Sequence, residues 1–282
     1  MAEKTQTIKV AAGQIVSTPG DLDGNLKQME QMAKTAAKAG ARLILFAEGA
    51  ITGYLFTEGN IAKAVVAGGP ETARLLAAAA KHDIVLAAGG LERSRQGLHM
   101  SHFVAFPDGK LLVQRKHCLT PTEQGACAVP GAEKRKVFSV DGVKFAICIC
   151  ADSGIEDIWN KMADWGVQVY LGPTAGGGGR KFMKHAADLE DPKGLKSYLR
   201  DMAKVCFMGG GLEKCVQHHM ALIAVNLSGD DGVSNYHPGH ASIIDAGGKT
   251  VALVPGDFVV EHLRPQLLQG EIMVRKPRRY PA

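Results

Sequence analysis

The chain alternates short, continuous apolar runs with longer segments in which apolar residues recur every three or four positions. The short runs have the length and composition of buried strands, and the longer segments have the period of amphipathic helices. This pattern predicts strands at residues 8–16, 42–47, 84–88, 143–150, 167–171 and 222–227. It predicts helices at residues 25–39, 72–82, 155–165 and within 192–207.

Turn sequences predict that several neighbouring strands pair as hairpins. Pro107-Asp108-Gly109-Lys110 and Asp141-Gly142 each separate two apolar runs, which is a strong hairpin signal. Hairpins are therefore expected across residues 102–115, 136–150 and 241–254. Strands that alternate with helices and also form hairpins predict an α/β fold with two sheets and outer helices.

Composition is that of an ordinary globular protein, with 46% hydrophobic and 22% charged residues. No repeat, linker or composition shift divides the sequence, so residues 1–282 are expected to form a single domain. Residues 265–282 are expected to form a C-terminal arm, because the last eight positions hold Arg275, Lys276, Arg278 and Arg279. This basic arm is expected to be solvated or to contact another subunit.

Charge and hydropathy exclude several partners. The formal net charge is only +5, and no basic face interleaved with aromatic residues marks a nucleic-acid surface. No apolar run reaches the 18 or more residues of a membrane span, and the first seven residues carry no export signal. The six cysteines are therefore expected to be free thiols in the cytoplasm rather than a disulfide framework.

One cysteine stands where a strand meets a helix. Cys150 ends the apolar run 143–150, and a predicted helix follows shortly after it. Backbone N–H groups converge at such a turn, which favours a thiolate and can hold an oxyanion. Cys148 lies two residues earlier on the same face of the predicted strand and is expected to be part of the core.

A carboxylate and an ammonium stand at the ends of two other predicted strands. Glu48 follows the run 42–47, and Lys116 follows the run 111–115. Alone, the first could be an ordinary loop acid and the second a solvated lysine. Together with Cys150 they supply the base, the positive charge and the nucleophile that thiol-dependent acyl transfer requires.

Other candidate sites are less complete. Cys215 with His218, and His237 with His240, have ligand-like spacing, but no coherent set of four ligands accompanies them, so no metal is expected. Residues 176–179 are glycines without the sequence of a phosphate-binding loop and are expected to form a flexible loop. The sequence has no GxSxG motif of the serine hydrolases.

The sequence resembles the nitrilase superfamily of carbon–nitrogen hydrolases over almost its whole length. The resemblance is carried by Gly13-Gln14, Asp23-Gly24-Asn25-Leu26, Phe46-Ala47-Glu48, Thr52-Gly53-Tyr54, Arg115-Lys116-His117, Pro121-Thr122-Glu123-Gln124-Gly125, Cys150-Ala151-Asp152 and Gly239 with Ser242-Ile243-Ile244-Asp245. It departs from the family at Ala47, where proline is usual, and at Ala151, where an aromatic is common.

The resemblance implies a four-layer α-β-β-α sandwich and a homodimer or higher homo-oligomer. It implies catalytic roles for Glu48, Lys116 and Cys150 and supporting roles for Glu123, the backbone N–H of Ala151, and Tyr54. It implies hydrolysis of a non-peptide C–N bond in a small linear amide, through a thioester and without a cofactor. Nitrile hydrolysis, N-acyl transfer and a catalytically silent binding protein are the alternatives, and a metal-binding protein is a further one.

Overall fold

Two six-stranded sheets are stacked face to face in the computed structural model, which describes residues 5–126, 128–205 and 211–280. In spatial order, the first sheet contains β15 (Gln266–Val274), β1 (Gln6–Gln14), β2 (Leu43–Phe46), β3 (Val85–Ser94), β4 (Gly97–Ala105) and β5 (Leu111–Arg115). The second contains β14 (Thr250–Val254), β13 (Ala241–Ile244), β10 (Ala221–Asn226), β8 (Val169–Thr174), β7 (Val143–Ile147) and β6 (Phe138–Val140).

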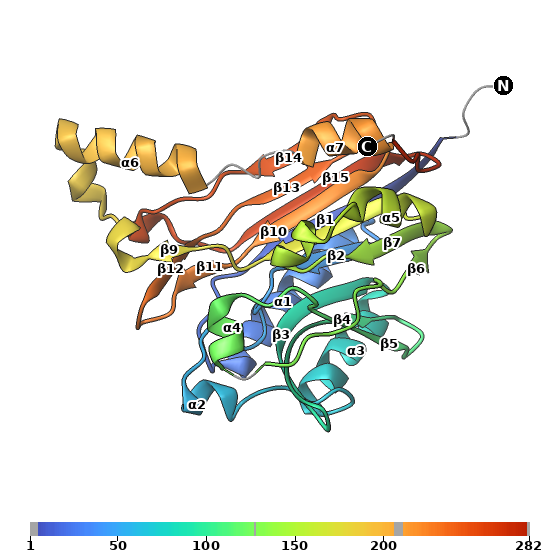
Figure 1. Ribbon diagram of the computed structural model, residues 1–282, viewed down its shortest axis with the longest axis horizontal. Coiled ribbons are helices and arrows are strands. Elements are labelled where there is room, and N and C mark those ends of the chain that lie inside the picture. Colours follow the sequence, from blue (N-terminus) through green and yellow to red (C-terminus); the bar gives the residue numbers. More distant parts are fainter. Residues whose placement is uncertain (1–4, 127, 206–210, 281–282) are drawn as a thin grey trace.

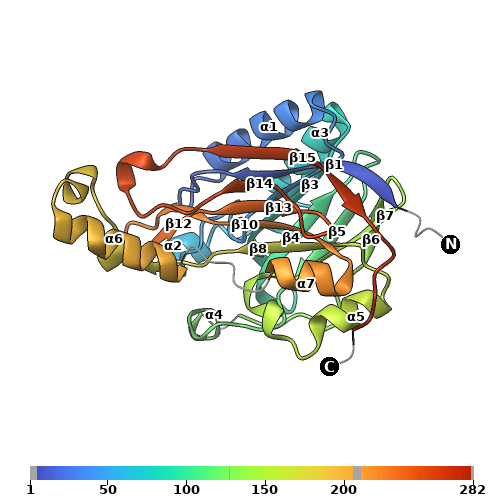
Figure 2. The ribbon, with the colours of Figure 1, turned by 90° about the horizontal axis from the view of Figure 1, so that it is seen from above.

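Helices cover the outer face of each sheet. In Figure 2, α1 (Leu22–Lys38) and α3 (Pro70–His82) lie on one side of the two sheets, and α5 (Ile158–Asp164) and α7 (Gly211–His218) lie on the other. The order helix, sheet, sheet, helix is the four-layer α-β-β-α sandwich expected from the sequence. No described helix combines the length and the apolar character that a bilayer crossing requires.

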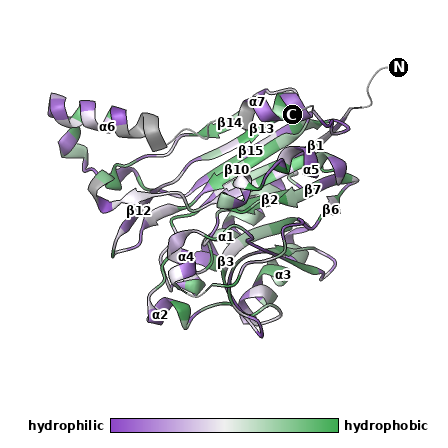
Figure 3. Cartoon of the chain, in the orientation of Figure 1, coloured by the Kyte–Doolittle hydropathy of each residue, from purple (hydrophilic) through white to green (hydrophobic). Residues whose placement is uncertain are grey.

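The core fills the spaces between the layers, and Figure 3 shows the apolar residues gathered on the central strands. One cluster lies around the first sheet and between the two sheets and includes Leu43, Phe46 and Ile147. A second cluster joins α5 to the second sheet and includes Cys148, Met162 and Tyr170. Each sheet therefore buries both faces, which explains the continuous apolar runs of β2, β8 and β10.

The two sheets share one pattern of strand directions. From β15 to β5, neighbouring pairs run antiparallel, parallel, parallel, antiparallel and antiparallel. From β6 to β14, the second sheet repeats the same series. Glu48 follows β2 of the first sheet, and Cys150 follows β7 of the second.

Several expectations need correction. Strands β3 and β4 extend well beyond 84–88 and 102–106 and form one long hairpin. Residues 266–274 of the expected C-terminal arm are β15, which pairs antiparallel with β1 along its full length. The expected glycine loop is partly ordered as β9 (Gly178–Gly179), which pairs with β12 (Asn235–Pro238), itself paired with β11 (Ser228–Asp230).

The remaining helices lie around the sandwich. Short α2 (Glu58–Ile61) and α4 (Pro121–Gly125) lie beside the first sheet, whereas α6 (Pro192–Val205) projects from the body (Figure 1). Short 3-10 turns are η1 (Cys150–Gly154), η2 (Arg180–Phe182), η3 (Ala186–Leu189) and η4 (Val260–His262). The last described residues are tied to the helical layer, because Asn160 and Tyr280 exchange two hydrogen bonds of 2.8 Å.

Candidate active site

Two carboxylates meet one ammonium beside the stacked sheets. The Nζ of Lys116 donates to Glu48 Oε1 at 2.9 Å and to Glu123 Oε1 at 2.7 Å. All three side chains are at most 1% exposed. We call this group, Glu48, Lys116 and Glu123, the carboxylate–lysine cluster. The structure thus brings together three residues that the sequence placed on separate segments.

The backbone around the cluster is closely fitted. Glu48 follows β2 and lies against β3 at Gly89, where an added Cβ would stand 2.9 Å from the Cα of Glu48. Only glycine allows this approach. Both backbone polar groups of Lys116 are hydrogen-bonded. Its N–H donates to the carbonyl of Met100 at 2.8 Å, and its carbonyl accepts from the N–H of Gly131 at 2.7 Å.

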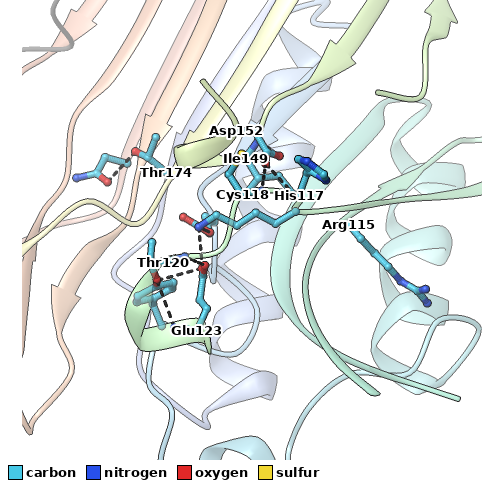
Figure 4. Close-up of polar contacts among 12 residues, drawn as sticks. Arg115, His117, Cys118, Thr120, Glu123, Ile149, Asp152 and Thr174 are labelled. Carbon is cyan, nitrogen blue, oxygen red and sulfur yellow. Dashed lines mark hydrogen bonds and ion pairs between the residues drawn. The ribbon is translucent and has the colours of Figure 1, made fainter. Parts of the chain in front are cut away.

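Glu123 is held at the start of α4 by a capping box with Thr120. The backbone N–H of Thr120 donates to Glu123 Oε2 at 2.7 Å, and the hydroxyl of Tyr54 donates to Oε1 at 3.1 Å (Figure 4). With Lys116, Glu123 therefore accepts three hydrogen bonds. This arrangement fixes the carboxylate in one position, which in turn fixes the ammonium.

Cys150 occupies a strained turn next to this cluster. It is the first residue of η1 and has φ = +48°, in the left-handed region that residues other than glycine seldom adopt. Its side chain packs against the core between the sheets, whereas Cys148 belongs to the cluster beneath α5. The expectation that both cysteines share one face is therefore wrong, because β7 ends at Ile147 and the chain turns before Cys150.

Cys150 is a partly exposed residue, whereas Glu48 and Lys116 are buried. Burial raises the pKa of Cys150 to about 12, and the negative charge of Glu48 adds to that rise. Lys116 and the backbone of Ala175 act in the opposite direction. In the free protein this group is therefore a thiol rather than the thiolate that such a turn favours, and a thiol needs a base before it can act as a nucleophile.

Glu48 has the properties of that base. Burial raises its pKa to about 7, with a further contribution from the charge of Glu123 and opposition from Lys116. No described group donates a hydrogen bond to its Oε2, although the thiol of Cys150 interacts with the same carboxylate. A carboxylate with one free oxygen and a pKa near neutrality suits proton transfer in both directions.

Lys116 remains an ammonium. Burial alone would lower its pKa, but the negative charges of Glu48 and Glu123 raise it above its ordinary value. Ala151, the second residue of η1, is partly exposed, and the first N–H groups of a helix have no acceptor within that helix. The site therefore offers an ammonium and a backbone N–H near the thiol.

Tyr54 and His237 form a wall near the cluster. Their rings meet edge to face with centroids 6.0 Å apart, and His237 is 3% exposed. Burial raises the pKa of Tyr54 and lowers that of His237, so both are neutral. His237 was considered only as a metal ligand from the sequence, and its spacing from His240 gave no signal of this packing role.

Sequence reasoning also missed Arg135. This arginine is buried and pairs at 2.6 Å with Asp152, which lies two residues after Cys150. It stands in the basic stretch 133–136 between β5 and β6, where no local pattern separates it from a solvated arginine. Only the three-dimensional arrangement identifies it.

Among the residues that the structure describes, no three His, Cys, Asp or Glu side chains gather as a metal site would require. Cys215 is buried beneath the second sheet, and His218 stacks on Trp159 with ring centroids 5.8 Å apart. Cys118, Cys148, Cys150 and Cys215 carry free thiols. Cys127 and Cys206 lie outside the described residues.

Comparisons with known proteins identify the family. The family model described as carbon–nitrogen hydrolase matches residues 9–199. Nitrilase 1 of Arabidopsis thaliana is 26% identical over 191 residues, which are 61% of this chain and 55% of the relative. An aliphatic nitrilase of Rhodococcus rhodochrous is 30% identical over 136 residues, 43% of this chain and 37% of the relative. The chain thus spans about half the length of the nitrilases it matches, or less.

Solved structures share the fold. A CN-hydrolase superfamily protein of Xanthomonas campestris superposes with a TM-score of 0.71 at 16% identity, covering 95% of this chain and 91% of that one. A mutant of an amidase from Nesterenkonia sp. AN1, with an acetamide moiety added at its active site cysteine, gives 0.69 at 20% identity, with coverages of 94% and 90%.

Proposed function

The chain belongs to the carbon–nitrogen hydrolase family, and from that premise we propose that it hydrolyses the C–N bond of a small linear amide through a thioester on Cys150. The observation that carries this proposal is the meeting of a partly exposed cysteine with a buried glutamate and a buried ammonium. Nucleophile, base and positive charge come from three segments far apart in the sequence. A purely structural core has no need of a buried, half-satisfied carboxylate.

The first half-reaction starts from the thiol. Glu48 accepts the proton of Cys150 as the sulfur attacks the amide carbon, so the rise in the thiol pKa is overcome within the same step. The developing oxyanion is stabilised by the ammonium of Lys116 and the backbone N–H of Ala151. Glu48 then gives its proton to the departing nitrogen, the C–N bond breaks, and ammonia or an amine leaves.

The second half-reaction hydrolyses the thioester. Glu48 removes a proton from a water molecule that attacks the acyl carbon, and it returns this proton to the departing sulfur. Glu123 keeps Lys116 in place throughout, and Tyr54 fixes Glu123 and lines the site. No cofactor enters this scheme, because the cysteine, glutamate and lysine account for every proton and bond.

Nitrile hydrolysis is the second candidate, because two of the relatives reported above are named nitrilases. We favour the amide because Cys150 is followed by Ala151-Asp152. This Cys-x-Asp pattern is similar to that of amidase-type members, whereas nitrile-cleaving members tend to have tryptophan and glutamate after the cysteine. N-acyl transfer would use the same thioester with an amine in place of water. The expected homo-oligomer and the cytoplasmic location remain predictions.

Ammonia release from a panel of small amides, carbamoyl compounds and nitriles tests the proposal. We expect turnover of at least one linear amide, an acyl adduct on the peptide containing Cys150 by mass spectrometry, and loss of both in Cys150→Ala. Hydroxylamine added to the reaction separates transfer from hydrolysis, because an acyltransferase forms hydroxamate in preference to the acid. Ammonia release that persists in Cys150→Ala would overturn the mechanism.

A further inference from the structure

A second buried charged group joins the two segments that carry Lys116 and Cys150. Asp152 is fully buried, and its Oδ1 accepts the backbone N–H groups of His117 at 2.9 Å and Cys118 at 2.8 Å. Its Oδ2 accepts the N–H of Ile149 at 3.1 Å. The carboxylate therefore binds the residue that follows Lys116 and the residue that precedes Cys150, and Figure 4 shows it between these segments.

Arg135 completes this connection. Its Nη1 donates to Asp152 Oδ2 at 2.6 Å and to the carbonyl of Arg115 at 3.4 Å. Its other nitrogens donate to the carbonyls of Glu133, at 2.8 Å, and Ala132. The guanidinium thus contacts the residue before Lys116, while Asp152 contacts the residues after it.

A buried ion pair is poor evidence of stabilisation, because removing two charges from water offsets most of their attraction. Such a pair can instead favour one arrangement of the segments that it joins. Here it would fix the distance between the two oxyanion donors, because Lys116 Nζ and the Ala151 N–H come from the two segments that Asp152 joins. A shift of about 1 Å between catalytic groups can lower a rate about 10²-fold.

We propose that Arg135 and Asp152, together called the clamp, are positioning residues. They fix the position of Lys116 relative to the turn that carries Cys150. This inference rests on the proposed function for its kinetic consequences. The clamp contacts neither substrate nor reacting atoms, and it acts only through the backbone on either side of the site.

Three variants test the clamp. Arg135→Met removes the charge and the donors but keeps a long side chain, Asp152→Asn removes the carboxylate charge at nearly constant shape, and Arg135→Lys keeps a cation with fewer donors. Glu92→Gln is the matched control, because Glu92 is also 1% exposed and ion-paired, to Arg115 at 2.8 Å. In Figure 4 the side chain of Arg115 points away from Asp152.

We expect Arg135→Met and Asp152→Asn to lower kcat about 10²-fold with little change in KM. Arg135→Lys should recover part of this loss, and Glu92→Gln should keep wild-type kcat even where its melting temperature falls. A merely structural pair would lower the melting temperature of all four variants and leave the kcat of the folded protein unchanged. That result, or a loss confined to KM, would overturn the clamp.

A second measurement does not depend on turnover. The rate at which iodoacetamide alkylates Cys150 can be followed by mass spectrometry of its peptide. This rate reports the reactivity of the thiol, which depends on its position relative to Glu48 and Lys116. We expect slower alkylation in the clamp variants and wild-type alkylation in Glu92→Gln; wild-type rates in all folded variants would overturn the inference. If the wild-type protein cleaves no substrate in the panel, the proposed function fails and this measurement still decides the clamp.

Discussion

The carboxylate–lysine cluster and the clamp are both buried, lie on neighbouring segments and differ in how fully their charges are satisfied. In the clamp, one carboxylate faces one guanidinium, and both carboxylate oxygens accept hydrogen bonds. In the cluster, two carboxylates share one ammonium, and Oε2 of Glu48 accepts none from the described residues. Complete pairing holds a structure in place, whereas incomplete pairing leaves a group free to take a proton.

The physical basis of this difference is the imbalance of charge. Burial and the charge of Glu123 raise the pKa of Glu48 to about 7, and the single ammonium only partly offsets them. A buried carboxylate of this kind is destabilising by itself. Its position beside a strained, partly exposed cysteine is what we expect of a cluster that serves a reaction rather than the fold.

Removing the unsatisfied carboxylate should have the largest effect. Glu48→Gln keeps the shape of the side chain but removes the base for both proton transfers, so we expect kcat/KM to fall about 10²–10⁴-fold. Steady-state ammonia release measures this change, and circular dichroism establishes that the variant is folded. An active Glu48→Gln would assign the base to another group.

Removing the shared cation should have the next largest effect. Lys116→Met eliminates one oxyanion donor, and the loss of such a donor lowers kcat about 10²–10³-fold. Because Lys116 also opposes the rise in the Glu48 pKa, the acid limb of the activity profile should move to higher pH. The exposed Lys110 of the β4–β5 hairpin provides a control, since Lys110→Met should leave both quantities unchanged.

The imbalance should be visible in the pH dependence of the wild-type protein. Glu48 must be ionised to accept the thiol proton, so kcat/KM should fall about tenfold per pH unit below its pKa of about 7. Above that pH the profile should level off, because the pKa of Cys150, about 12, keeps the thiol protonated. A profile that instead rises steadily to pH 10 would indicate an isolated thiolate.

Partial unpairing of Glu123 should have the smallest effect. Tyr54→Phe removes one of three hydrogen bonds to this carboxylate and preserves the ring contacts with His237 and Phe56. A hydrogen bond to a charged carboxylate contributes about 1.5 kcal/mol or more, so we expect kcat/KM to fall about tenfold. A loss as large as that of Lys116→Met would show that the tyrosine hydroxyl contacts the reacting groups.

Local pattern was enough to place the groups at strand ends. The end of an apolar run marks the end of a buried strand, so Glu48 and Lys116 could be recognised as polar residues that follow β2 and β5. Residues that act through distant contacts could not be recognised in this way. Arg135 stands in a stretch that reads as solvated, and Gln266–Val274 becomes a strand only because β1 offers it an edge.

The pairing of β15 with β1 has a consequence for biosynthesis. Gln6 pairs with Val274 and Gln14 with Gln266, so the chain's first and last strands are hydrogen-bonded neighbours. One border of β1 therefore has no partner until residues 266–274 have left the ribosome, and contacts so distant in sequence make folding slow. Deletion of residues 266–274 should therefore leave this border of β1 unpaired and, through the neighbouring β2, displace Glu48.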